Sequence, residues 1–133
     1  MPRYLLDTNT CIAIFRNHPL VIKRMTTVAP GDCAVSTVTS YELYTGVAKC
    51  AKPAQERAKV DLLLGTVAEQ AFEPGAAREA ARIRALLESQ GQSIGPYDLL
   101  LAGQALALSL ILVTANTREF SRVPNLLLEN WQS

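Results

Sequence analysis

Three acidic residues, far apart in this sequence, stand where predicted strands end or predicted helices run. Asp7 directly follows the apolar run 4–6, and Asp98 follows the Gly-Pro pair that starts an apolar helix. Glu42 lies in an apolar helical stretch, where a glutamate turned toward the protein needs a partner. Carboxylates gathered in one crevice repel one another unless a divalent cation neutralises them, and oxygen ligands favour Mg²⁺ or Mn²⁺. Convergence of these acids would therefore create a metal site.

A Mg²⁺ ion held by carboxylates supports phosphodiester hydrolysis, because it orients and acidifies water and stabilises charge on the breaking bond. Asn116 follows the last apolar run, 110–114, and is expected at the same sheet edge as Asp7. Structural roles compete with this hypothesis. Asp7 can serve as a helix cap, Asp98 as a first-turn acid and Glu42 as half of an ion pair. For Asp98 taken alone the structural role is the better explanation, and only the acids together favour a metal.

Other common catalytic sets are missing from the sequence. The single histidine, His18, precedes a proline in a predicted loop, and no serine or cysteine has a nucleophile-elbow pattern, so a hydrolytic triad has little support. The seven glycines lack phosphate-loop or dinucleotide spacing. A phosphoacceptor receiver domain would use a lysine near the final strand, but the last lysine is Lys59. A haloacid-dehalogenase-type phosphatase would have an aspartate where Asn9 stands.

Short apolar runs alternate with helical patterns along the chain. The predicted strands are 4–6, 33–36 and 110–114, with a brief edge strand at 71–72. The predicted helices are 11–15, 19–28, 37–50, 53–67, 76–90 and 94–108. No two-residue hairpin turn joins consecutive strands, so the pattern predicts an α/β sandwich with a mainly parallel central sheet. In such folds the site lies at the carboxyl ends of the strands.

Length and composition indicate one packed domain spanning residues 1–133. Of the 133 residues, 49% are hydrophobic and 19% charged, a balance that disordered chains do not show. The net charge is +1, so nucleic-acid binding would need a local basic patch. Cys11, Cys33 and Cys50 are odd in number and form no paired motif, which fits a reducing cytosol. With no signal-peptide pattern and no membrane-spanning run, a cytoplasmic protein without membrane association is expected.

Four short polar motifs occur in order along nearly the whole chain. They are Asp7-Thr8-Asn9, Glu42-Leu43 with Gly46, Ile94 to Asp98, and Val113 to Phe120. With these motifs the sequence resembles PIN-domain ribonucleases, and most of all VapC-type toxins. The resemblance implies a PIN-like three-layer α/β/α fold, a Mg²⁺ cofactor for which Mn²⁺ can substitute, and RNA cleavage that arrests translation. It also implies neutralisation by a cognate VapB-like antitoxin.

Position by position, the resemblance implies that Asp7, Glu42 and Asp98 bind the metal. Asn116 completes the catalytic set at a place where many relatives have a fourth acid, and its neutral amide weakens the case for two tightly held metals. Ala115 stands where many close relatives have Asn. From their positions beside Asp7, Thr8 and Asn9 are expected to fix the orientation of its carboxylate. The resemblance adds supporting roles for Thr114, which keeps the pattern around Asn116, and for Glu119, which could contribute through water.

Four arginines are candidates for contact with RNA phosphates, because guanidinium groups match phosphate oxygens: Arg118, Arg122, Arg82 and Arg84. For each one alone, solvated surface charge is the better explanation. Relatives of this branch act on structured RNA, so the resemblance implies a folded RNA such as tRNA, with the initiator tRNA anticodon loop as one hypothesis. The apolar surplus and the resemblance predict a homodimer. The alternative function is a catalytically weak PIN-like module that binds RNA or protein, which Asn116 makes conceivable.

Overall fold

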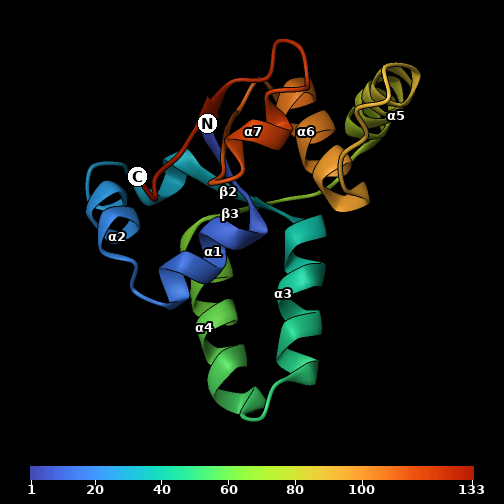
Figure 1. Ribbon diagram of the computed structural model, residues 1–133. Helices are drawn as coiled ribbons and strands as arrows, with labels where there is room; N and C mark the ends of the chain where they lie inside the picture. Colours follow the sequence, from blue (N-terminus) through green and yellow to red (C-terminus); the bar gives the residue numbers. More distant parts are fainter.

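A five-stranded parallel sheet forms the centre of the protein, with strand order β3-β2-β1-β4-β5 (Figure 1). The structure is a computed structural model that describes residues 1–133. The strands are β1 (Tyr4–Leu6), β2 (Cys33–Ser36), β3 (Ala68–Gln70), β4 (Ile111–Val113) and β5 (Leu128–Glu129). The predicted α/β class with a parallel sheet is therefore confirmed.

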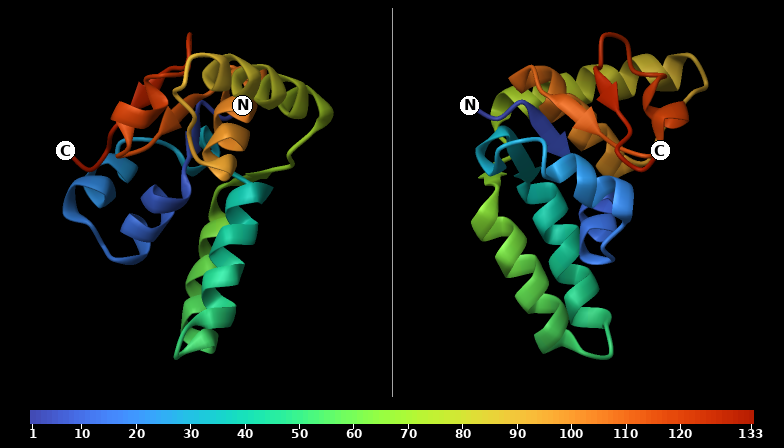
Figure 2. Two further views of the ribbon diagram at one scale, coloured as in Figure 1. Left: turned by 45° about the vertical axis from the view of Figure 1, so that its right-hand side comes forward. Right: turned by 90° about the vertical axis from the view of Figure 1, so that its left-hand side faces the viewer.

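At least one helix lies between each strand and the next along the chain. The helices are α1 (Thr8–Phe15), α2 (Pro19–Met25), α3 (Thr37–Lys49), α4 (Pro53–Thr66), α5 (Pro74–Ser89), α6 (Pro96–Leu108) and α7 (Thr117–Phe120), with a 3₁₀ turn at Pro30–Asp32. Proline occupies the first position of α4, α5 and α6, where its fixed φ suits a helix start. Helices α3 and α4 pair as a long arm that extends beyond the sheet (Figure 2).

The two faces of the sheet bury different halves of the core. On β1, Tyr4 and Leu6 belong to the core shared with α1, α3 and α4, whereas Leu5 points to the core shared with α5 and α6. This alternation follows from the two-residue period of a strand. All three residues are buried, as expected of a central strand covered on both faces. The three-layer α/β/α arrangement is thus also confirmed.

Two parts of the predicted sheet differ from the structure. The edge strand lies at 68–70 rather than 71–72, because Phe72 leaves the ladder and its backbone N–H donates to Thr37 Oγ1 at 3.1 Å. Buried Gln104 holds the same turn, since its Nε2 donates to the carbonyls of Gln70 and Ala71 at 3.2 and 3.1 Å. Strand β5 was not predicted, since two residues carry no periodic pattern.

Helices α5 and α6 approach closely at Gly103. A Cβ at this position would lie 2.5 Å from the backbone nitrogen of Ala80, and backbone cannot give way without moving a helix. Gly103→Ala is therefore expected to lower the free energy of unfolding by about 1–3 kcal/mol through overpacking. Urea denaturation measures the change. The control Gly65→Ala, on α4 with open space around it, should raise the same quantity by about 0.5–1 kcal/mol.

Equal stability of Gly103→Ala and the wild type in that titration would contradict the close helix contact. The contact matters for function because α6 carries Asp98 in its first turn. A shift of α6 against α5 would displace this carboxylate relative to the rest of the strand-end acids. The small residue therefore links core packing to the position of Asp98.

Candidate active site

Asp7 lies immediately after β1, at the carboxyl edge of the sheet. Its backbone N–H donates to the carbonyl of Val113 at the end of β4 (3.0 Å), and its Oδ1 accepts the backbone N–H of Thr10 (2.8 Å). This bond caps α1, and the residue is only 5% exposed. The hydrogen bond engages Oδ1 alone. Capping and ligand binding can therefore use different oxygens of the same carboxylate.

Glu42 points from α3 toward the start of α1. The hydroxyl of Thr8 donates to Glu42 Oε1 at 2.7 Å and lies 3.2 Å from the hydroxyl of Thr39. The sequence predicted that Thr8 and Asn9 would orient Asp7, and the structure corrects this. Thr8 orients Glu42, a backbone N–H orients Asp7, and Asn9 is exposed without a side-chain hydrogen bond. The cause is the cap itself, which uses the N–H of residue 10.

Asp98 sits in the first turn of α6, with its side chain folded back toward the helix start. A Cβ at Gly95 would lie 3.4 Å from Asp98 Oδ2, so the glycine leaves room for this orientation. Burial raises the pKa of Asp98, and the charges of Glu119, Asp7 and Glu42 raise it further, to about 6. Asp7, Glu42 and Glu119 thus all lie within electrostatic reach of Asp98.

Glu119, which the sequence predicts as a supporting residue, lies within electrostatic reach of Asp98. Its Oε1 accepts the backbone N–H of Gly95 at 3.0 Å, and its charge acts on Asp98 more strongly than those of Asp7 and Glu42. Asn116 was predicted as the fourth member of the catalytic set. It is exposed, and its amide donates to Glu119 Oε2, so in the structure it supports a neighbouring acid.

The remaining predicted supporting residue, Thr114, holds the loop that leads to these two side chains. It is fully buried, and its hydroxyl accepts the backbone N–H of Asn116 at 3.0 Å. The hydroxyl therefore fixes the turn after β4 from which α7 begins. Thr114 acts on the site through Asn116 and Glu119, as a positioning residue.

The donor set suits a hard divalent cation, although the side chains as they lie do not form a closed cage. No three His, Cys, Asp or Glu residues are arranged to bind one ion. Instead, several oxygens are engaged by nearby N–H and O–H donors, as expected when carboxylates repel one another. The donors are all oxygen, and burial, together with repulsion from neighbouring carboxylates, raises the pKa of Asp98. A cation would relieve this repulsion. The residues thus fit Mg²⁺ or Mn²⁺.

The four predicted RNA-binding arginines lie at different places. Arg118 and Arg122 flank Glu119 along the chain, and Arg122 donates to the carbonyl of Ser93 at 3.0 Å. On α5, Arg82 pairs with Glu79 at 2.7 Å and Arg84 pairs with Glu88 at 2.9 Å. These two ion pairs are exposed and worth little, about 0–1 kcal/mol. The arginines can therefore exchange partners at low cost.

The raised pKa of Asp98 gives the metal-free protein a predicted pH dependence. Because the folded state holds this proton more tightly than the unfolded chain, its free energy of unfolding should fall as the pH rises from about 4 to about 6. Above about pH 6, where Asp98 is ionised in both states, the free energy of unfolding should fall no further on account of this residue. Urea denaturation of the wild type and of Asp98→Asn, in EDTA across this range, measures it. The stability difference between the two should grow up to about pH 6, and a difference independent of pH would contradict the shift.

Comparison with known proteins gives this arrangement a context. The family model of the PIN domain matches residues 4–126. The chain belongs to the PIN-domain family. Within that family it is 36% identical to "tRNA(fMet)-specific endonuclease VapC" of Shigella flexneri, over 98% of this chain and 99% of the relative. It is 37% identical to "Ribonuclease VapC2" of Rickettsia felis, over 96% and 97%. These relatives place the chain among the VapC proteins.

Solved structures agree with this placement in the PIN-domain family. The VapC fold in DNA-bound VapBC from Salmonella typhimurium is similar, with a TM-score of 0.93 and 34% identity over 98% of this chain and 99% of that one. VapBC2 from Rickettsia felis, bound to a promoter DNA fragment, gives a TM-score of 0.90 at 36% identity over 96% and 98%. Both are complexes of toxin and antitoxin. In the present chain, no helix is both long and apolar enough to cross a membrane.

Proposed function

We propose that this VapC-family protein is a Mg²⁺-dependent endoribonuclease, the toxin of a toxin–antitoxin pair. The observation that carries the proposal is the arrangement of four acids at the carboxyl edge of the sheet: Thr8, next to Asp7, donates to Glu42, and Gly95, beside Asp98, donates to Glu119. Burial and the charges of the other three acids raise the pKa of Asp98, in agreement with this arrangement. Relatives covering nearly the whole chain are named ribonucleases or endonucleases, which supports the same reaction. Mn²⁺ should substitute for Mg²⁺, because the donors are oxygen.

Three of the four carboxylates would hold the metal in this proposal. When bound, Mg²⁺ supplies an activated water and neutralises charge on the scissile phosphate. Asp7, Glu42 and Asp98 are the residues that would hold it, since Asp7 is fixed by a helix cap and Asp98 by its place in the first turn of α6. Glu42 is kept in position by Thr8, and Glu119 by the N–H of Gly95. The protein thus presents acids whose orientation is set before RNA arrives.

The proposed substrate is structured RNA, and the anticodon loop of initiator tRNA is the specific hypothesis. The relatives in Shigella flexneri and Salmonella typhimurium, at 36% and 34% identity, are named tRNA(fMet)-specific endonucleases. Cleavage of that RNA would arrest translation, and a substrate of this kind implies action in the cytoplasm. Arg118 and Arg122 flank Glu119 and offer phosphate contacts on the side of α7.

The proposed antitoxin contact is a groove that runs from the acids along the helical arm. It has a volume of about 420 Å³ and lies between α1 and the α3–α4 pair. At one end are Thr8 and Glu42, and further along are the apolar side chains of Ile12, Phe15 and Val60. A VapB-like segment with an apolar helical face and a basic residue would match both ends. The neighbouring VapBC complexes support a partner of this type.

We also propose that the toxin forms a homodimer. Exposed apolar side chains on separate elements, including Leu62 at 73% and Leu127 at 62% exposure, are consistent with further association. Light scattering at micromolar concentration is the measurement, and a monomeric mass would reject the dimer. The catalytic proposal does not depend on this outcome.

Expression without antitoxin tests the proposed function. The wild type should stop growth, and Asp7→Asn should relieve the arrest while circular dichroism shows an unchanged fold. Growth should also recover when the product of the adjacent small reading frame is co-expressed. Equal toxicity of wild type and Asp7→Asn would favour the alternative, a PIN-like module that acts by binding RNA or protein.

A further inference from the structure

Two exposed tyrosines stand directly beside the acids, each one residue before a carboxylate. Tyr41 precedes Glu42 on α3, and Tyr97 precedes Asp98 on α6. Their rings are 5.7 Å apart between centroids at an angle of 54°, and the Tyr97 hydroxyl donates to that of Tyr41 at 3.3 Å. Tyr41 is 56% exposed and Tyr97 41% exposed. Such large apolar rings at a polar edge have no core-packing explanation.

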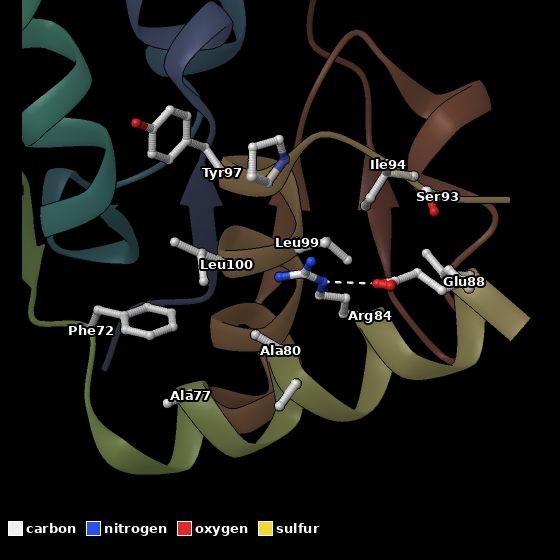
Figure 3. Close-up of a pocket in the computed structure, with 13 residues that line it drawn as sticks. Phe72, Ala77, Ala80, Arg84, Glu88, Ser93, Ile94, Tyr97, Leu99 and Leu100 are labelled. Carbon is white, nitrogen blue, oxygen red and sulfur yellow. Dashed lines mark hydrogen bonds and ion pairs between the residues drawn. The ribbon is translucent and has the colours of Figure 1, made fainter.

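An apolar hollow of about 520 Å³, lined by Tyr97 but not by Tyr41, lies between α5 and α6. Figure 3 shows Tyr97 at one end of it, with Leu100 and Phe72 along the same side. Arg84 lies on the α5 side, in the ion pair with Glu88. The volume is within the range of ligand pockets, about 300–1,000 Å³. The hollow is lined by one arginine, Arg84, which could contact a phosphate, and mostly by apolar side chains, which could contact a base.

We propose that the Tyr41–Tyr97 pair and the hollow beside Tyr97 bind an unpaired nucleobase of the RNA, next to the phosphate on which the carboxylates act. The inference rests on the proposed function, because it takes RNA as the substrate. Every base has a π face, so stacking on tyrosine tolerates any sequence, and single-stranded loops are where bases are free to stack. The pair is therefore a positioning element for the reaction.

Electrostatics favours a base over other occupants of this surface. The strand-end acids repel an RNA backbone, so phosphates gain little affinity here without a cation. Stacking supplies attraction that does not depend on the charge of the phosphate. Each ring and its neighbouring carboxylate belong to consecutive residues, whose Cα atoms are about 3.8 Å apart. The two side chains leave the helix in different directions, so a base on the ring would lie beside the acids and not on them. Arg84 can then leave its exposed pair with Glu88 for the neighbouring phosphate.

The test uses RNA hairpins that carry one fluorescent 2-aminopurine at successive loop positions. The full-length protein carries Asp7→Asn, so that the RNA stays intact. Fluorescence should be quenched at one loop position by stacking. Adding Tyr97→Leu should remove the quenching and weaken binding by about 5- to 100-fold, whereas Tyr97→Phe, which keeps the ring, should retain both. Tyr44→Leu, one helical turn beyond Tyr41 on α3 but turned toward Asp61, is the matched control.

A second variant keeps the proposal testable without altering the tyrosines. Ala77→Trp fills the hollow from the exposed side of α5 and should abolish the same quenching. Quenching that survives both Tyr97→Leu and Ala77→Trp would overturn the proposal. Conversion of a dimer to a monomer by Tyr97→Leu would overturn it too, because the rings would then belong to a contact between two copies. If the wild type cleaves the RNA but the Asp7→Asn protein quenches no loop position, this inference is wrong and the proposed ribonuclease activity stands. If there is neither cleavage nor binding of the RNA, both are wrong.

Discussion

Replacing Asp98 with asparagine is expected to lower kcat for RNA cleavage by about 100- to 1,000-fold and, at the same time, to stabilise the metal-free protein. The loss follows from removing a charged oxygen ligand at the place where phosphate charge must be neutralised. The gain follows from burial and from three neighbouring carboxylates, which together raise the pKa of Asp98 to about 6. Because the side chain is half-buried and partly screened, the gain at pH 7 should be about 1 kcal/mol.

Two measurements on the same preparations check that Asp98→Asn lowers the cleavage rate while it raises the stability of the metal-free protein. Single-turnover cleavage in Mg²⁺ gives the rate, and urea denaturation in EDTA gives the stability. Glu79→Gln, which removes an exposed acid of α5 paired with Arg82, is the matched control and should change neither by much. Adding Mg²⁺ should stabilise the wild type more than Asp98→Asn. A variant that is inactive but less stable than the wild type in EDTA would indicate a structural role for Asp98.

Gly46→Trp should weaken antitoxin binding by about 100-fold or more, an effect of roughly 3 kcal/mol or above. Gly46 lies one turn after Glu42 on the wall of the groove between α1 and the α3–α4 pair, and a Cβ there would meet nothing within 4 Å. The indole would therefore occupy groove space without disturbing the fold. Isothermal titration with the cognate VapB-like antitoxin gives the Kd.

Gly65→Trp provides the matched control for this experiment. Gly65 is also a helical glycine with open space around it, on α4, but it does not line the groove. Its substitution should leave the Kd unchanged. Equal affinity of Gly46→Trp and wild type would place the antitoxin on another surface, without affecting the assignment of the acids.

The fold and the position of Asp7 could be predicted because both depend on local pattern. Short apolar runs ended by polar residues indicate buried parallel strands, and Asp7 is one residue past such a run. The carboxyl ends of parallel strands lie at the same edge of the sheet, whatever the conformation of the connecting loops. The helical pattern of α5, with a glycine after its end, was equally local.

Contacts between distant parts of the chain explain what the sequence did not show. Glu119 reaches the site through the backbone N–H of Gly95, twenty-four residues away, from a helix only four residues long. Thr8 turned out to orient Glu42, thirty-four residues away. The apolar pattern of α6 likewise did not predict that Gln104 is fully buried and donates a hydrogen bond to the backbone at the end of β3. Each of these roles is set by tertiary hydrogen bonds, which have no periodic signature.

The central claim is tested most directly by incubating purified wild type and Asp7→Asn with total cellular RNA, in Mg²⁺ or in EDTA, and mapping the new RNA ends by sequencing. The account predicts discrete ends that only the wild type makes and only in Mg²⁺, and the tRNA hypothesis predicts that they fall in an anticodon loop. The same ends made by Asp7→Asn, or made by the wild type in EDTA, would contradict metal-dependent cleavage by these carboxylates.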